Sequence, residues 1–446
     1  MKPTVLLLLL VLLAVSGPSR AQVRSSHLDL PRILPSLSRP ANHSRIFYAV
    51  MFDAGSTGTR IHVYTFIQNG SEKLPVLDNE MFHSTKPGLS AYADSPETAG
   101  ETVRRLLKVA KKAVPRLDWK RTPLVLRATA GLRLLPVEKA QALLDQVKGF
   151  TRHCRDPRWG CFYKVQHVFD ESPFLVPDNS VSIMDGTNEG ILAWISLNFL
   201  TGHLNANTKK TVGILDLGGG STQITFLPKL KKTVETAPVA DFVARLDFFN
   251  STFELYSHSY LGNGIMAARL AALGALGVEG LEWRVFKSSC LPNKFRDEWS
   301  FGGLTYQVSG DPDGHAGYKH CYQEVLKVVK GIIHQPCELE DSNVFFAFSY
   351  YFDRAVDAGL IGGAQGGMLQ VRDFKKRAKE VCNKMTKFPP ISSFLCMDLA
   401  YITCLLKDGF GFKDSTVLQL TKKVNNVEAS WALGAMLDHF QSLKIR

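Results

Sequence analysis

The sequence predicts a mixed α/β protein with two related lobes. Segments with strand and helix patterns alternate along the whole chain, which is typical of α/β folds. An apolar strand that ends at an aspartate, a turn rich in Gly, Ser and Thr, and a returning strand occur twice, at residues 46–66 and 211–227. The chain has 446 residues, 45% of them hydrophobic, which is enough for more than one core. We expect lobe I over residues 45–184 plus 422–446 and lobe II over residues 185–421.

The first 21 residues have the pattern of a signal peptide. Lys2 precedes the apolar run Thr4–Val15, and Ser19-Arg20-Ala21 is a small-x-small cleavage site. The run is too short to span a bilayer, and no later segment of the sequence reaches that length. We therefore expect a protein of the endoplasmic-reticulum lumen or the extracellular space, without stable membrane insertion after cleavage. Residues 22–44, rich in Ser, Pro and Arg, are expected to be a linker.

Sequons and cysteines agree with a secretory route. Candidate glycosylation sites are Asn42, Asn69 and Asn250. Eight cysteines in an oxidising compartment are expected to form disulfides, although spacing alone does not determine the pairs. Short local loops such as Cys290–Cys321 and Cys382–Cys396 are the simplest choices.

The net charge of +12 indicates attraction to anions, including nucleotides, or simply a solvated basic surface. Basic residues are spread along the chain and do not cluster with aromatic ones, so nucleic acid is not an expected partner. The charge does not choose between these two interpretations, and the sequence leaves the oligomeric state open.

The element predictions follow from hydrophobic period and turn residues. Strands are expected where β-branched and aromatic residues precede Gly, Ser or Asp: Ile46–Phe52, Arg60–Phe66, Leu124–Arg127, Val181–Met184, Thr211–Leu215 and Ile224–Leu227. Helices are expected where apolar residues recur every three or four positions: Pro96–Val114, Glu138–Phe150, Ile191–Leu200, Met266–Leu276, Tyr322–Ile333, Phe345–Ala358, Val371–Met385, Leu395–Leu406 and Val427–Leu443. Residues 285–320 are expected to be irregular.

The two turns carry the strongest chemical signal. Small residues allow backbone N–H groups to approach a phosphate, and their hydroxyls add donors. The candidate phosphate-binding residues are Gly55, Ser56, Thr57, Gly58 and Thr59 in the first turn, and Gly218, Gly219, Gly220, Ser221 and Thr222 in the second. Asp53 and Asp216 are expected to face each other across a cleft, where two acids beside a phosphate would hold a hard cation through its waters. A single such turn is an ordinary hairpin, whereas the duplication indicates a nucleotide site.

Five ordered motifs resemble the apyrase family of nucleoside triphosphate diphosphohydrolases, within the actin/Hsp70/hexokinase superfamily. They are DAGSTGTR (53–60), ATAGLR (128–133), DGTNEG (185–190), DLGGGSTQ (216–223) and WALGA (431–435). The resemblance covers residues 46–442 and is greatest to the soluble endoplasmic-reticulum nucleoside diphosphatases of that family. It implies two RNase-H-like lobes, a cleft between them, hydrolysis of UDP and GDP to monophosphate and phosphate with Mg²⁺ or Ca²⁺, and a part in lumenal glycoprotein glucosylation and folding.

Roles for single residues also follow from the resemblance. It assigns the general base to Glu189, which on sequence alone could equally be a helix N-terminal acid. It implies that Ser221 and Gln223 orient the attacking water and that Thr129 and Trp431 lie beside the metal. Without the resemblance, a Trp on an apolar helix is more often a core residue. It implies an aromatic under the nucleobase, for which Tyr350 is the candidate within a stretch that otherwise reads as helix core. It also implies the bridges Cys290–Cys321 and Cys382–Cys396, and leaves Cys337 and Cys404 without counterparts.

Residues 150–171 depart from the family pattern. The segment carries Cys154 and Cys161, which are expected to close a small disulfide loop; a His/Cys metal site has poor spacing, and an artefact of the sequence is a further alternative. Its position between two motifs leaves open that it gates or obstructs the cleft. If the segment blocks the cleft, the protein would be an inactive secreted nucleotide-binding protein. A separate alternative is a kinase or exopolyphosphatase of the same superfamily.

Overall fold

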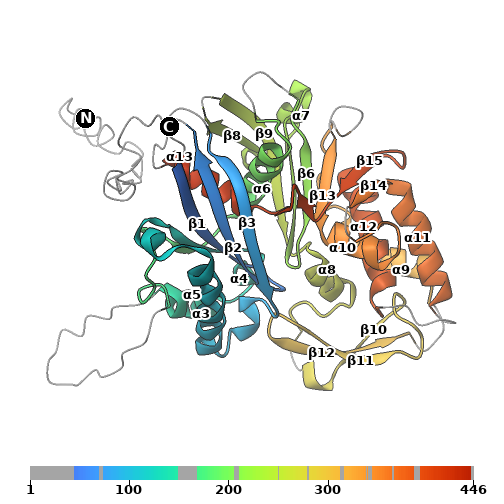
Figure 1. The fold of residues 1–446 in the computed structure, drawn as a ribbon. Helices are drawn as coiled ribbons and strands as arrows, with labels where there is room; N and C mark the ends of the chain where they lie inside the picture. The colour runs from blue at the N-terminus through green and yellow to red at the C-terminus, as the bar shows by residue number, and fades with distance from the viewer. Residues whose placement is uncertain are drawn as a thin grey trace, which may run out of the picture.

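The computed structural model describes residues 45–69, 74–148, 168–204, 210–249, 251–278, 281–311, 316–337, 339, 344–363, 366–385 and 392–442. The predicted signal peptide and linker, Asn42, Asn250, and residues 150–167 with Cys154 and Cys161 lie outside this set. Two large β-sheets, two smaller ones and the helices around them make up the described molecule (Figure 1).

The first sheet contains the first of the two predicted turns. Its strand order is β3-β2-β1-β4-β5, with β1 antiparallel to β2 and parallel to β4. Alternate residues of β1 face opposite sides, so Val50 and Phe52 join the core with α3 and α5, while Ala49 and Met51 face α6 and α13. The elements are β1 (Arg45–Ala54), β2 (Thr59–Gln68), β3 (Val76–Thr85), α3 (Pro96–Ala113), β4 (Leu124–Ala128), α4 (Ala130–Arg133), α5 (Val137–Lys148) and β5 (Val181–Ile183).

The second sheet contains the second turn and has the order β14-β15-β13-β6-β7-β9-β8. Its central strand β6 is antiparallel to β7 and parallel to β13, as β1 is to β2 and β4. The strands are β6 (Gly213–Leu217), β7 (Ser221–Phe226), β8 (Val243–Phe248), β9 (Ser251–Leu261), β13 (Phe345–Ser349), β14 (Gly367–Gln370) and β15 (Val417–Leu420). Its helices are α7 (Lys231–Glu235), α8 (Ile265–Ala272), α9 (Tyr318–Val329), α10 (Tyr350–Asp357), α11 (Val371–Lys384) and α12 (Leu395–Cys404), the last continued by a π-helical turn at Leu405–Phe410.

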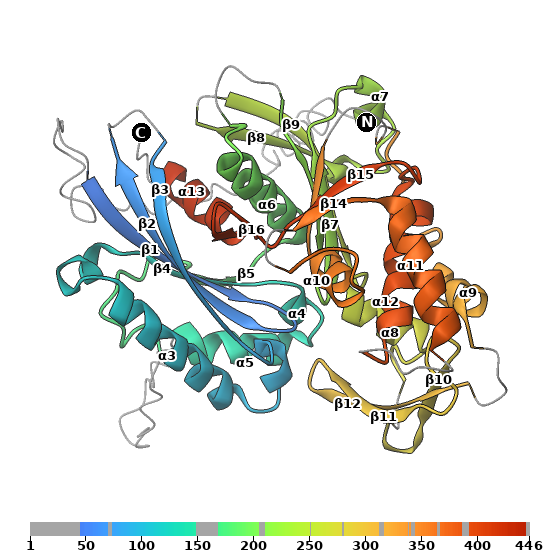
Figure 2. The same ribbon diagram turned by 45° about the vertical axis from the view of Figure 1, so that its right-hand side comes forward.

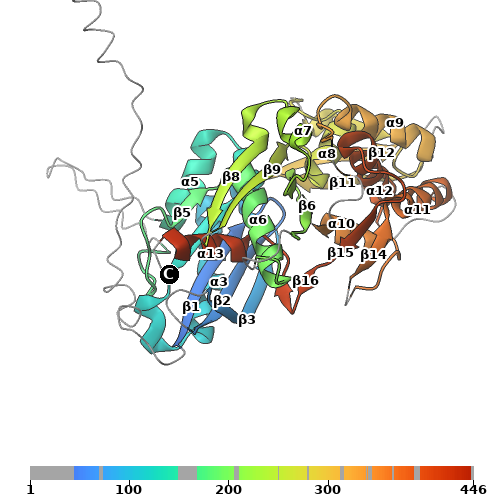
Figure 3. The ribbon, with the colours of Figure 1, turned by 90° about the horizontal axis from the view of Figure 1, so that it is seen from above.

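Two helices from distant parts of the chain form a layer between the sheets. α6 (Gly186–Leu200) and the C-terminal α13 (Ala432–Ser442) pack together, and α13 also contacts β1 (Figures 1 and 2). A methyl group on Gly434 would lie 2.0 Å from the carbonyl oxygen of Leu192, so the two helices meet backbone to backbone. The view from above also places α6 and α13 side by side (Figure 3). One hydrophobic cluster, which includes Trp194 and Leu433, therefore serves both sheets.

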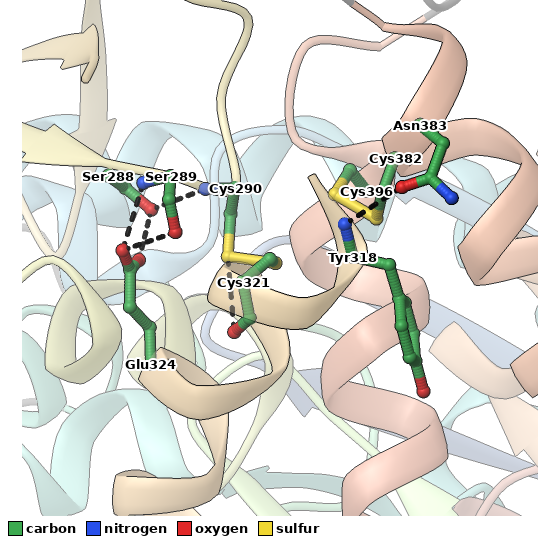
Figure 4. Close-up of a disulfide and its surroundings, with 9 residues drawn as sticks. All are labelled: Ser288, Ser289, Cys290, Tyr318, Cys321, Glu324, Cys382, Asn383 and Cys396. Carbon is green, nitrogen blue, oxygen red and sulfur yellow. Dashed lines mark hydrogen bonds between the residues drawn. A yellow bond between two sulfur atoms is a disulfide. The ribbon is translucent and has the colours of Figure 1, made fainter. Parts of the chain in front are cut away.

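A small third sheet, β10-β12-β11, extends from the second lobe beside two disulfides. Its strands are β10 (Val285–Ser288), β11 (Arg296–Phe301) and β12 (Leu304–Gly310). Cys290–Cys321 and Cys382–Cys396 are both bonded, and the sulfur atoms of Cys321, Cys382 and Cys396 lie within 4.8 Å of one another (Figure 4). The Glu324 carboxylate accepts hydrogen bonds from Ser288 and Ser289 beside the first bridge (Figure 4). Cys337 is exposed and Cys404 buried, and both are free thiols.

The structure corrects several element predictions. Residues 285–320 are not irregular, because they form the third sheet and the start of α9. Phe345–Ala358 is not one helix: its first five residues form β13 in the middle of a sheet, where both faces are apolar and the alternation that marks a strand is hidden. The C-terminal helix starts at Ala432, after the two-residue strands β16 (Lys423–Val424) and β17 (Val427–Glu428). β3, β8 and β9 were not predicted. Their exposed or half-exposed positions weaken the hydrophobic signal.

Candidate active site

The two turns meet at one cavity of about 320 Å³ between the sheets. The strands β1, β4, β6 and β13 all end there, as is usual for ligand sites in α/β folds. A methyl group on Gly219 would lie 2.5 Å from the Ser56 hydroxyl and from a Thr57 methyl, so the turns touch across the cavity. Residues predicted for phosphate binding that line it are Gly55, Ser56, Thr57, Gly58, Gly218, Gly219, Gly220 and Ser221.

The first turn is clamped by its neighbours. The Gly55 N–H donates to the Gly58 carbonyl at 3.1 Å and closes the turn. A methyl group on Gly88 would be 2.2 Å from the Gly55 carbonyl oxygen, and one on Gly131 would be 2.7 Å from Ser56 Cα. The turn is thus held between two glycines of other segments, and its backbone has no room to move toward them.

The second turn is closed by the same kind of hydrogen bond as the first, but a helix holds it in place instead of two glycines. The Gly218 N–H donates to the Ser221 carbonyl at 3.0 Å. The first amides of α8 donate back to this turn, Ile265 to Gly218 and Met266 to Gly219, at 2.8 and 2.9 Å. The N-terminus of α8 therefore stabilises the carbonyls of the second turn.

Three predicted residues do not line the cavity. Thr59 is fully buried in β2, and the Thr222 hydroxyl donates to the Asp216 carbonyl at 2.8 Å, so neither is placed to contact a phosphate. Gln223 lies behind Ser221 and donates to its hydroxyl at 2.7 Å and to that of Ser259 at 2.8 Å. Gln223 is thus placed to orient Ser221, which does line the cavity.

Asp53 and Asp216 are buried carboxylates on opposite sides of the cavity. Arg60 donates to Asp53 Oδ2 at 2.7 Å, across the β1–β2 hairpin. Burial raises the pKa of Asp216 to about 6, against a hydrogen bond from Ser349 and the charge of Arg60, which lower it, while the charge of Asp53 raises it. Each aspartate keeps one buried Oδ1 that accepts no hydrogen bond from the described residues.

These two free oxygens fit a hard divalent cation, which prefers oxygen ligands. Among the described residues, the carboxylates of Asp53, Asp216 and Glu189 do not converge within 4.8 Å as a direct three-ligand site would. The separation suits a cation that keeps its waters. Thr129 and Trp431, both buried, line the same cavity and complete the set that the sequence predicted for the metal.

Glu189 lies in the first turn of α6, whose N-cap Asp185 accepts hydrogen bonds from Thr187 and Asn188. It is therefore a helix N-terminal acid, and it also lines the cavity, so the two interpretations of the sequence do not exclude each other. Burial raises the pKa of Glu189 to about 8; Arg133 opposes this rise, and the charges of Asp216 and Asp53 add to it. Such a pKa suits a proton acceptor that works near neutral pH.

Sequence reasoning missed the partner of Glu189. Arg133 donates to Glu189 Oε2 at 2.6 Å, to the Met184 carbonyl at 3.1 Å and to the Ser221 hydroxyl at 3.3 Å. It thus ties the carboxylate to the second turn. Arg133 ends the 128–133 motif, and the signal that could have identified it is a lone Arg in an otherwise small and apolar motif that ends beside a cavity.

The far end of the cavity is lined by α10. Tyr350 and Arg354 face the cavity, with the guanidinium 5.5 Å from the ring centre, whereas Tyr351 and Phe352 are buried in the core. The aromatic stretch thus divides between cavity and core. Ser349, at the end of β13, has φ 56° and ψ −127°, an unusual backbone for a side chain that reaches the site. Cavity residues absent from the predictions are Arg60, Phe82, Ser84, Thr85, Lys86, Ala130, Met266, Ser349, Asp353, Arg354, Lys422, Glu428, Ala429 and Ser430.

Arg354 is held by two acids, one of them fully buried. Asp398, fully buried in α12, accepts from Arg354 at 3.2 Å and from two nitrogens of Arg269 at 2.7 and 2.5 Å. Asp357 contacts Arg354 from the other side at 2.9 Å. Because Arg269 belongs to α8, the same network connects the support of the second turn to the end of the cavity that α10 lines.

The described end of the unusual segment lies away from the cavity. Phe169 is buried against Phe52, and its N–H donates to the Val147 carbonyl at 3.0 Å, next to the end of α5. Between residues 131 and 188, none of those that the structure describes lines the cavity. Asn69 is exposed at the end of β2.

Comparisons with known proteins agree with this geometry. The GDA1/CD39 (nucleoside phosphatase) family matches residues 39–446. The chain is 58% identical to ectonucleoside triphosphate diphosphohydrolase 5 of Gallus gallus over 93% of this chain and 92% of that protein. It is 56% identical to the Homo sapiens nucleoside diphosphate phosphatase ENTPD5 (89% and 88% covered) and 48% identical to ectonucleoside triphosphate diphosphohydrolase 6 of Mus musculus (92% and 86% covered). The fold is similar to that of a nucleoside triphosphate hydrolase of Neospora caninum, with a TM-score of 0.59, 13% identity and coverage of 91% and 94%.

Proposed function

The chain belongs to the GDA1/CD39 (nucleoside phosphatase) family, and on that premise we propose that it hydrolyses nucleoside diphosphates to monophosphate and phosphate. The observation that carries the proposal is the cavity, which is lined by the two Gly/Ser/Thr turns, two aspartates and a buried glutamate. The relatives at 56–58% identity, one of them named a nucleoside diphosphate phosphatase, support the same reaction.

The reaction needs a water placed in line, an acceptor for its proton, and charges that offset the phosphate. Backbone N–H groups and hydroxyls of the two turns hold the terminal phosphate. Glu189, in its ionised form, takes the proton from the attacking water, and Arg133 holds the carboxylate in place. The Ser221 hydroxyl, oriented by Gln223, holds the water. The P–O bond to the remaining phosphate then breaks, leaving nucleoside monophosphate and inorganic phosphate.

A divalent cation, Mg²⁺ or Ca²⁺, would be held by Asp53 and Asp216 through water, with Thr129 and Trp431 beside it. When bound, it supplies positive charge that offsets the phosphate oxygens. The two unpartnered Oδ1 atoms support this assignment. We propose UDP and GDP as the substrates, with the nucleobase on the exposed face of Tyr350.

We also propose that the protein works in the endoplasmic-reticulum lumen or outside the cell, where removal of UDP would favour glycoprotein glucosylation and folding. The signal-peptide pattern and two disulfides support this location, because disulfides persist in oxidising compartments. Across the described part of the chain, every helix is too short or too polar to cross a bilayer.

The first test is phosphate release from UDP, GDP, ADP and UTP by purified protein with Mg²⁺, Ca²⁺ or EDTA, together with Glu189→Gln. We expect cation-dependent release from UDP and GDP that the Gln variant loses. Binding of nucleotide without turnover would instead support an inactive nucleotide-binding protein. Transfer of phosphate to an acceptor, with no free phosphate, would support a kinase.

A further inference from the structure

A strip of positive charge covers the outer side of lobe I, away from the active site. Residues 104–121 contain eight lysine or arginine residues and one acid, Asp118. None of the eight lines the cavity. Seven of them are exposed and define what we call the α3 strip: Arg105, Lys108, Lys111, Lys112, Arg116, Lys120 and Arg121.

Most of this charge is uncompensated. Arg105 donates to the Thr102 hydroxyl at 3.2 Å, and Arg116 lies 5.7 Å from the ring of Trp119. The other five side chains have no ion pair or hydrogen bond within the described residues. Lys111 and Lys112 stand in the last turn of α3, where the helix dipole favours cations. Lys120 and Arg121 stand likewise in the last turn of the 3-10 helix Arg116–Arg121. Lys108 lies in the middle of α3, where neither the helix dipole nor a partner side chain among the described residues accounts for it.

A second basic helix shows what a partly compensated surface looks like. α11 carries six cations and two acids, so its compensation is partial: Arg377 pairs with Glu380 at 2.8 Å, and Lys379 lies 5.8 Å from the ring of Tyr318. Its other four cations have no ion pair or side-chain hydrogen bond within the described residues. Neighbouring cations, Arg377 first, lower the pKa of Glu380, and Lys407 first lowers that of Asp414. α3 and α11 lie at opposite ends of the molecule (Figures 1 and 2).

The structure favours a linear polyanion over a membrane. The apolar side of α3, with Val103, Leu106 and Leu107, is buried in the core and cannot enter a bilayer. Leu117, 91% exposed, is a single apolar side chain within the strip. The strip follows the helix axis, where a rise of ~1.5 Å per residue places its cations one after another over roughly 10 Å of α3 and on into the following turn.

The strip also lacks what a nucleic acid needs. Single strands bind through bases stacked on free aromatic rings. The aromatic residue in the strip is Trp119, which packs 6.0 Å from Phe174, lies under Arg116, and donates its ring N–H to the Val114 carbonyl. A polyanion without bases is therefore the better match.

We propose that the α3 strip binds a linear sulfated polysaccharide. Sulfates spaced along a polysaccharide chain match a row of lysines and arginines, and release of counterions drives the binding. The binding is independent of the active site, so it would retain the enzyme at a sulfated surface without changing its chemistry. The proposed secretory location is where such polysaccharides occur.

The test measures binding of a heparin dodecasaccharide to the full secreted protein from 50 to 300 mM NaCl. The variant Lys108→Gln/Lys111→Gln/Lys112→Gln is compared with Lys376→Gln/Lys379→Gln/Lys384→Gln on α11, which removes the same charge. We expect the α3 variant to lose on the order of tenfold or more in affinity at 150 mM NaCl, with a shallower salt dependence. The α11 variant should bind nearly as the parent does, and both should keep the parental rate of UDP hydrolysis and melting temperature.

Three results would overturn the proposal. Equal losses in the two variants would mean attraction by net charge and no local site. Equal binding of fully desulfated heparin would exclude recognition of sulfate. Tighter binding to vesicles containing phosphatidylserine, or to single-stranded DNA, than to the dodecasaccharide would assign the strip to a different partner.

Discussion

The two phosphate-loop hairpins have the same backbone and different electrostatics. In each, an aspartate is the last residue but one of the first strand, and a glycine two residues later closes the turn. The residue seven positions after the aspartate pairs with it across the hairpin. That residue is Arg60 in the first hairpin, where it neutralises Asp53, and Gln223 in the second, where it turns to Ser221 and Ser259. The first hairpin therefore carries a cation bonded to its own aspartate, whereas Asp216 has no such partner on its hairpin and feels the charge of Arg60 from the other one.

The two hairpins therefore have different proposed roles: the first supports the phosphate, and the second lies beside the groups that handle water. The groups proposed to handle water, Glu189 and Ser221, lie beside the second hairpin and are tied together by Arg133. The first hairpin is enclosed by Gly88 and Gly131 and contributes Asp53 and phosphate donors. Duplication has thus produced two loops that can share a phosphate while the proton transfer belongs to one.

The largest expected effect comes from the second side. Glu189→Gln keeps the size of the side chain and removes its basicity, so kcat should fall by about 10²- to 10⁴-fold, the usual contribution of a general base. KM for UDP should change little. Steady-state kinetics with a melting curve measures this. A variant that keeps more than a tenth of the parental kcat would move the chemistry away from Glu189 and break the comparison.

A smaller loss should follow when the two turns are pushed apart. Gly219→Ala places a methyl group 2.5 Å from Ser56 and Thr57, so one turn must shift. A displacement of this kind near reacting groups costs roughly 10²-fold in kcat/KM. Gly362→Ala is the matched control, because nothing lies within 4 Å of its added methyl. Parental activity in Gly219→Ala would show that contact between the turns is dispensable.

Making the first hairpin resemble the second should raise KM for UDP about tenfold. Arg60→Gln removes the cation beside Asp53 and leaves one more net negative charge in the cavity, so KM for UDP should rise on the order of tenfold by charge repulsion. Arg245→Gln, at an exposed position in β8, controls for net charge. An unchanged KM with a lowered kcat would instead place Arg60 in the chemical step.

The pH dependence of stability tests the two acids of the second side without any substrate. Folding raises the pKa of Asp216 from 3.8 to about 6 and that of Glu189 from 4.5 to about 8. The native state then binds more protons than the unfolded state in these windows, so each group makes the unfolding free energy fall as pH rises through them. The decline is on the order of a few kcal/mol.

Urea unfolding in EDTA from pH 4 to 8.5 measures that decline. Asp216→Asn should flatten the curve between about 4 and 6, and Glu189→Gln between about 4.5 and 8. A parental slope in both variants would show that neither carboxyl carries the proton uptake.

The sequence was most informative where strand, turn and function coincide. Both turns and the two aspartates were predicted because the strand, turn and strand pattern occurs twice, and Glu189 was predicted from the family resemblance; all of them line the cavity. The family and its fold were confirmed by the comparisons. The disulfide pairs are bonded as the resemblance implied.

What the sequence missed depends on tertiary contacts. Arg133 and Arg354 are ordinary helix cations until a carboxylate 56 or 44 positions away is brought within hydrogen-bonding distance. Thr59 and Thr222 belong to the right motifs but are the first residue of β2 and the second of β7, where alternation directs a side chain away from the cavity. β13 was predicted as helix because a central strand buried on both faces has no polar alternation.

The layer between the sheets has a consequence for synthesis. α13, made of residues near the end of the described chain, packs against α6 and contacts β1, one of the first strands made. Phe47 already packs on Phe66 and Trp194 on Phe253, but the contact of Phe47 with Phe440 and the close packing of Gly434 on Leu192 need α13. The hydrophobic cluster that serves both sheets is therefore complete only after α13 has been made.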